Sequence, residues 1–191
     1  MRALALNPFF YKGEFFMATA TAIPVITITR VLNASRERVF AAWTDPTQMH
    51  QWFAPSSAFD VTFDVTIEAG THLGSSYKLQ MFNRKAGTTH TAVGKYIEFV
   101  PPEKLVFTWD RHIGACNQDT DPAEDTIVSV ELRDLGGKTE LTLTHALVSD
   151  AASRASHTQG WTGCINRLAH LFDPNAEQLP IPAPRPIWQV E

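Results

Sequence analysis

The side chains of this chain that are suited to proton transfer, metal binding or nucleophilic attack are mainly its seven histidines and two cysteines. The histidines form no His-x-His or His-Glu-x-x-His pair, which are spacings that can place two imidazoles on one metal ion. The acidic stretch from Asp119 to Asp125 lacks the glycine and the bidentate glutamate of a calcium-binding loop, and it indicates a solvated surface loop. The sequence therefore predicts no metal site and no cofactor.

A nucleophilic side chain is not indicated either. Cys116 and Cys164 have neither Cys-x-x-Cys nor zinc-ligand spacing, and no Gly-x-Ser-x-Gly motif occurs. Cys164 falls beside the apolar stripe of the last predicted helix, which favours an inert buried thiol over a reactive one. Two cysteines without such a pattern are typical of a reducing compartment, so we expect a cytoplasmic protein.

His145 is the strongest single candidate for acid–base chemistry. It falls in a predicted hairpin of strands 125–135 and 138–147, whose two-residue turn Gly136-Gly137 favours positive backbone φ angles. This turn sets the register of the cross-strand pairs: Leu132 with Leu141, Val130 with Leu143, Val128 with His145, and Arg133 with Glu140 on the other face. His145 therefore lies on the apolar, inward face, where an imidazole could donate or accept a proton. A buried histidine with satisfied hydrogen bonds is the alternative.

Length, composition and charge bound the class of protein. With 191 residues and 44% hydrophobic content, the chain suits one domain with a substantial core. The net charge of −4 comes from 16 basic and 20 acidic side chains without a run of one sign, which argues against binding to nucleic acid. No stretch reaches the roughly 20 apolar residues of a membrane span. We expect an N-terminal extension (1–22), one domain (23–173) and a proline-rich tail (174–191).

Hydrophobic patterning predicts one strand, two short helices, six strands and one long helix. The strands are expected at Val25–Leu32, Phe59–Glu68, Ser75–Phe82, Thr89–Phe99, Leu105–His112, Asp125–Leu135 and Lys138–Leu147. The first helix follows Ser35, and the second has Asp45 as its N-cap and ends near Trp52. A helix of about 24 residues follows Ser149, with Trp161 and Ile165 on its apolar stripe. This order predicts an α+β fold, in which an antiparallel sheet of about seven strands curves around the last helix and leaves a cavity.

The segment Gly94–Trp109, GKYIEFVPPEKLVFTW, is a predicted hairpin interrupted by two prolines. A five-residue loop would pair Phe99 with Leu105 and Ile97 with Phe107. A four-residue loop would instead turn Tyr96 and Glu98 towards the interior. The first register is favoured because the second buries a glutamate.

The order of elements and several short motifs resemble the SRPBCC superfamily, which has the START or birch-pollen-allergen helix-grip fold, and within it the homologues of the heat-shock-protein-90 ATPase activator. The motifs lie between residues 25 and 173, and they are Ile28-Thr29-Arg30, Val39–Pro46 (VFAAWTDP), Gln51-Trp52, Gly94–Trp109, Gly137–Leu143 and Gly160-Trp161. The long acidic loop 114–125 and both terminal extensions depart from the family pattern.

The resemblance implies a helix-grip fold whose cavity binds a hydrophobic or aromatic small molecule, and it allows a homodimer. The residues expected to line this cavity are Trp52, Phe53, Phe63, Tyr77, Phe107, Trp109, His112, His145, Trp161 and Ile165. Aromatic walls with few polar groups suit an apolar ligand, although they suit a plain core equally well.

Two other functions remain open at this stage. One is a cyclase or aromatase type of enzyme that uses His145 as general acid and base. The other is a co-chaperone-like or other protein-interaction module. The sequence favours a binding protein over an enzyme, and an interior filled by side chains would favour the interaction module.

Overall fold

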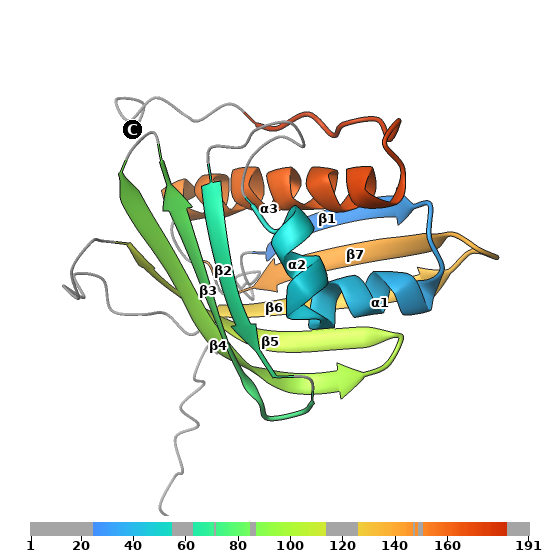
Figure 1. The fold of residues 1–191 in the computed structure, drawn as a ribbon, viewed down its shortest axis with the longest axis horizontal. Coiled ribbons are helices and arrows are strands. Elements are labelled where there is room, and N and C mark those ends of the chain that lie inside the picture. The colour runs from blue at the N-terminus through green and yellow to red at the C-terminus, as the bar shows by residue number, and fades with distance from the viewer. Residues whose placement is uncertain are drawn as a thin grey trace, which may run out of the picture.

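In the computed structural model, a seven-stranded antiparallel sheet curves around one long helix (Figure 1). The structure describes residues 25–54, 63–70, 72–84, 87–113, 126–146, 148 and 151–182. The strands are β1 (Val25–Leu32), β2 (Phe63–Ala69), β3 (Ser76–Asn83), β4 (Thr88–Val100), β5 (Lys104–Ile113), β6 (Thr126–Asp134) and β7 (Thr139–Ala146). They lie in the order β1-β7-β6-β5-β4-β3-β2, so that β1 and β2 are the edges of the sheet. The predicted α+β class and order of elements are confirmed.

Two short helices follow β1 and lie between the sheet and the long helix (Figure 1). Helix α1 (Arg36–Thr44) buries Val39 and Trp43, and α2 (Pro46–Trp52) begins directly after its cap, Asp45. The Asp45 carboxylate accepts hydrogen bonds from the Thr47 backbone N–H at 2.9 Å and from the Gln48 side chain at 3.1 Å. These bonds lower the pKa of Asp45, because they stabilise its charged form. The predicted cap and helix start are confirmed.

The β6–β7 hairpin has the register that its two-glycine turn predicts. Val128 lies opposite His145, and this pair shares the buried face with two apolar pairs, Val130–Leu143 and Leu132–Leu141. On the other face, Arg133 Nη2 lies 2.8 Å from Glu140 Oε1. Strand β1 pairs with the far side of β7, with Ile26 next to His145. The histidine is therefore covered by a strand on each side.

The β4–β5 hairpin agrees with the prediction at its turn and differs further along. Phe99 pairs with Leu105 as expected, but a β-bulge between Tyr96 and Glu98 places Tyr96, not Ile97, opposite Phe107. The extra residue of a bulge reverses the alternation of side chains. Tyr96 is consequently buried, and Ile97 is 49% exposed. The expected Ile97–Phe107 pair is wrong, because the bulge turns Tyr96 inwards without burying Glu98.

Helix α3 (Ala151–Phe172) lies across the concave side of the sheet (Figure 1). Six consecutive residues, from Trp161 to Asn166, are buried, so this part of the helix is covered on all sides. After α3 the chain turns at Asp173, whose carbonyl accepts the Ala176 N–H at 2.9 Å, and it runs back along the helix (Figure 1). The boundaries predicted for the terminal extensions stay predictions.

Candidate functional site

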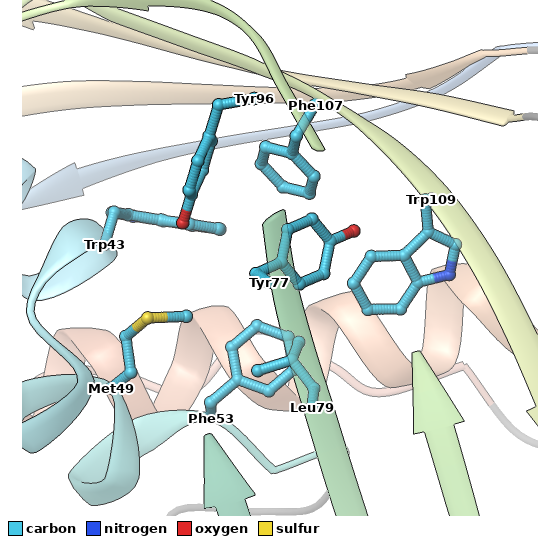
Figure 2. Close-up of a pocket in the computed structure, with 8 residues that line it drawn as sticks. All are labelled: Trp43, Met49, Phe53, Tyr77, Leu79, Tyr96, Phe107 and Trp109. Carbon is cyan, nitrogen blue, oxygen red and sulfur yellow. The ribbon is translucent and has the colours of Figure 1, made fainter. Parts of the chain in front are cut away.

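A pocket lined mainly by aromatic side chains lies between the sheet and the helices (Figure 2). Its lining comes from six parts of the fold, namely α1, α2, the residue after α2, β3, β4 and β5. The lining residues are Trp43, Met49, Phe53, Tyr77, Leu79, Tyr96, Phe107 and Trp109. The cavity volume among them is about 10 Å³, which is close to the space for one water molecule.

The rings of this pocket are in direct contact with one another. The centroids of Trp43 and Trp52 are 4.7 Å apart, and those of Trp109 and Trp161 are 4.9 Å apart. Phe53 meets Trp161 edge to face at 5.8 Å. Such contacts stabilise each ring pair by roughly 0.5–1.5 kcal/mol beyond the burial of area. We call these rings, together with Tyr77, Tyr96 and Phe107, the aromatic cluster.

Tyr77 is fixed by a hydrogen bond at an opening in the β4–β5 ladder. Its hydroxyl donates to the carbonyl oxygen of Thr108 at 2.6 Å, while the Lys95 backbone N–H bonds to the Thr108 Oγ1 at 3.1 Å. Tyr77 also lies opposite Gly94 on the neighbouring strand. Since Gly94 has no side chain, the tyrosine ring can lie against its backbone.

The indole N–H groups of the aromatic cluster fall into two kinds. Trp52 donates to the Ala42 carbonyl at 2.9 Å, and Trp161 donates to His145 Nδ1 at 3.0 Å. Trp43 and Trp109 bury their Nε1 atoms without a hydrogen-bond partner among the described residues. Figure 2 shows the Trp109 nitrogen on the side of its ring that faces away from Tyr77.

His145 lies next to Trp109 and Trp161 of the aromatic cluster. It is fully buried and takes part in a chain of hydrogen bonds. The Trp161 indole can only donate, so His145 Nδ1 is the acceptor and the ring proton is on Nε2. His145 Nε2 then donates to Thr126 Oγ1 at 2.8 Å, and that hydroxyl donates to the Trp109 carbonyl at 2.7 Å. Both ring nitrogens are thus satisfied within the fold.

The electrostatics keep His145 neutral. Burial and, to a smaller extent, the charge of His157, whose ring centroid is 4.8 Å away on α3, together lower the pKa of His145 to about 3. A group with this pKa has no proton to give as an imidazolium near pH 7, and its Nδ1 is already bonded to Trp161. The placement therefore favours a structural role for His145 over that of a general acid or base.

The stability of the protein is expected to fall between pH 7 and pH 5. Below about pH 6.5 the unfolded chain binds a proton at His145 while the folded protein does not, so acidification favours unfolding until the pH nears 3. A pH of 5 lies about 1.5 units below the pKa of the histidine in the unfolded chain. Protonation of the unfolded chain therefore lowers the free energy of unfolding by about 2 kcal/mol. Urea denaturation at both pH values measures the change. His145→Gln, which does not titrate, should lose about 2 kcal/mol less than the original protein; equal losses would contradict this prediction.

The structure brings together many of the residues expected from the sequence. Phe53, Tyr77, Phe107 and Trp109 line the pocket, and Trp52 and Trp161 contact it through their rings. Ile165 is fully buried on α3 in the same core. The side chains of Phe63 and His112 lie outside the described residues, as do those of loop 114–125.

Four lining residues were not expected from the sequence. Trp43 is buried on α1, and its reach into the pocket depends on the angle of that helix. Met49 and Leu79 are apolar residues of ordinary pattern. Tyr96 was assigned to the outer face, and only the bulge turns it inwards. A regular alternating pattern carries no signal for a bulge.

Among the described residues, the remaining candidates for chemistry show no reactive arrangement. Burial raises the pKa of the Cys164 thiol to about 12, so it is an unreactive core residue. Within the described ranges, no three histidine, cysteine or acidic side chains gather where a metal ion could sit. No described helix has the length and apolar character needed to cross a membrane.

A curved antiparallel sheet, a long helix across its concave side and an aromatic interior together define a helix-grip protein. The family model described as activator of Hsp90 ATPase homolog 1-like protein matches residues 33–173. The chain belongs to this family. No match is found among curated proteins.

Solved structures share the fold over most of this chain. Protein CV1439 from Chromobacterium violaceum is 27% identical, with a TM-score of 0.67 over 79% of this chain and 98% of its own. The AHSA1 (SPO3351) protein from Silicibacter pomeroyi is 22% identical, with a TM-score of 0.65 over 80% and 100%. CalU16 from Micromonospora echinospora is 21% identical, with a TM-score of 0.57 over 80% and 78%.

Proposed function

We propose that this protein binds a small hydrophobic or aromatic molecule that carries an oxygen acceptor, in the pocket between the sheet and the helices. The observation that carries this proposal is a pair of buried indole N–H groups, those of Trp43 and Trp109, without partners among the described residues. Buried polar groups are nearly always hydrogen-bonded, and each exception calls for an explanation. A ligand oxygen beside Trp43, or on the side of the Trp109 ring that faces away from Tyr77, would supply the missing acceptor.

The walls of the site suit a flat apolar guest. Rings from α1, β3, β4 and β5 present faces and edges on which an aromatic molecule can stack. Among the described residues the cavity is only about 10 Å³, so a guest must displace side chains. Met49 on α2 is suited to this, because an unbranched thioether changes rotamer at low cost.

The alternatives have weaker support. Acid–base catalysis by His145 conflicts with its burial and with its two occupied nitrogens. The small cavity volume fits a protein-interaction module. That function, however, would leave the two buried indole N–H groups without an acceptor. The buried free thiol of Cys164 supports a reducing, cytoplasmic setting. A homodimer stays a prediction.

The indole protons themselves provide the test. We would titrate ¹⁵N-labelled protein with 1-tetralone, a two-ring ketone, and with tetralin, which has the same ring skeleton without the oxygen. The ketone is expected to move the indole N–H signal of Trp43 or Trp109 downfield, because a new hydrogen bond forms there. The paired indoles of Trp52 and Trp161 serve as internal references, and tryptophan-to-phenylalanine variants assign the signals.

The two ligands also separate recognition of the oxygen from plain hydrophobic binding. Replacing the responding tryptophan by phenylalanine should weaken binding of 1-tetralone by about tenfold, the loss of one hydrogen bond in a buried site. The affinity for tetralin should fall less, because tetralin has no oxygen and loses no hydrogen bond. If 1-tetralone at millimolar concentration shifts neither indole signal, the proposed function is rejected.

A further inference from the structure

The chain continues past α3 into a segment, residues 173–182, that runs back along the outer side of the helix (Figure 1). We call this segment the strap. It contains no regular helix or strand, yet two of its side chains, Ala176 and Leu179, pack against the hydrophobic core. An extended segment in such a position must be held by specific contacts, because its backbone has no ladder to join.

The first contact is made by Asn166, in the middle of α3. Its Nδ2 donates to the Leu179 carbonyl at 2.8 Å, and its Oδ1 accepts the Leu179 N–H at 2.7 Å. One side-chain amide thus satisfies both backbone groups of one residue, as a neighbouring strand would. Asn166 is 1% exposed. A buried asparagine is unfavourable within a helix unless such partners are present.

The second contact joins the strap to the sheet. The guanidinium of Arg30, on edge strand β1, donates to the carbonyl oxygen of Glu177. The strap therefore bridges two elements, α3 through Asn166 and β1 through Arg30. Both contacts are hydrogen bonds to backbone groups of the strap. They therefore depend on the path of its backbone and only slightly on its side chains.

We propose that the strap is a releasable fastening that holds α3 against β1 and sets how often the aromatic cluster opens. Helix α3 carries Trp161, whose ring packs on Trp109 and Phe53. The cluster cannot widen towards α3 while the helix is fastened along its outer side. Beyond the Asp173 N–H bond to the Ala169 carbonyl at the end of α3, three hydrogen bonds and two apolar side chains hold the strap among the described residues. Local release therefore costs far less than unfolding. The claim that a ligand enters the opened cluster rests on the proposed function, whereas opening itself needs no ligand.

Leu179→Pro tests the proposal from the side of the strap. It removes the N–H that Asn166 accepts, while α3 and β1 keep their sequences. Hydrogen exchange of the Trp161 indole, which is bonded to buried His145, reports opening. We expect exchange at least about tenfold faster than in the original protein, from the loss of one buried hydrogen bond. Asn166→Leu, which removes the same contact from the helix side, should have an effect in the same direction.

Glu177→Ala is the matched control, because it keeps the carbonyl bonded to Arg30 and removes only an exposed side chain. Its exchange rate should equal that of the original protein. Unchanged Trp161 exchange in Leu179→Pro would overturn the proposal, as would a Leu179 amide that exchanges at the rate of an unprotected peptide.

A ligand measurement separates this proposal from the proposed function. If the strap controls entry, 1-tetralone should associate faster with Leu179→Pro in proportion to the change in exchange. Faster exchange with an unchanged association rate would overturn the strap as the control of entry. If neither protein binds 1-tetralone, the proposed function fails, and the exchange rates alone decide whether the strap holds the cluster closed.

Discussion

Gly94→Ala is expected to lower the free energy of unfolding by about 3 kcal/mol or more, because β4 has no room for a side chain there. A Cβ atom at this position would overlap the Thr108 carbonyl oxygen and lie 2.6 Å from the Tyr77 hydroxyl oxygen. The tyrosine cannot turn away without losing its hydrogen bond to the same carbonyl. The clash with backbone can be relieved only by separating β4 from β5.

Chemical denaturation of the variant measures this loss. Gly136→Ala is the matched control, because a Cβ there meets nothing within 4 Å and the cost is only that of a φ of +73°. That conformation costs an alanine about 1–2 kcal/mol. If the two alanine variants lost equal stability, the steric explanation for Gly94 would be wrong. Tyr77→Phe adds a second check, since it removes one clashing oxygen and should lessen the effect of Gly94→Ala.

His145→Leu is expected to cost about 3 kcal/mol although the residue stays apolar and of similar size. The change leaves the Trp161 indole N–H buried without an acceptor and removes the donor to Thr126. The loss is large because the ring of His145 joins two elements, α3 through Trp161 and β6 through Thr126.

A double-mutant cycle with Trp161→Phe isolates the reason. Phenylalanine has no N–H to leave unpaired, so the cost of His145→Leu should be about 1–2 kcal/mol smaller in that background. Urea denaturation at pH 7.5, above the titration of the unfolded histidine, measures all four proteins. Strictly additive losses would contradict a specific bond between His145 and Trp161.

Much of the fold can be predicted from local patterns in the sequence. The Asp45-Pro46 pair marks a helix start because an N-cap acceptor and a proline at the first turn have few other uses. The Gly136-Gly137 turn determines a register, and with it the inward face of His145, since a one-residue slip would expose every apolar partner. These signals act over a few residues, so no tertiary information is needed to interpret them.

The lining of the pocket is harder to predict from local sequence patterns. The bulge at Ile97 inserts one residue without a glycine or proline to mark it, and it brings Tyr96 into the pocket. Nothing in the local sequence separates Trp43 and Trp109 from Trp52 and Trp161. Yet the indole N–H groups of the first two lack hydrogen-bond partners among the described residues, and those of the last two have them. Whether an indole is paired depends on the atom that a distant element places beside it.

The sequence by itself thus determined the order of elements, the family and the inward face of His145. Only the tertiary structure decided that His145 serves Trp161 and Thr126, and that Asn166 holds Leu179 thirteen residues further on. The physical reason is the separation along the chain between the interacting residues. Capping, turns and alternation arise between near neighbours along the chain, whereas a buried hydrogen bond needs two atoms within about 3 Å, and only the packing of whole elements brings them there.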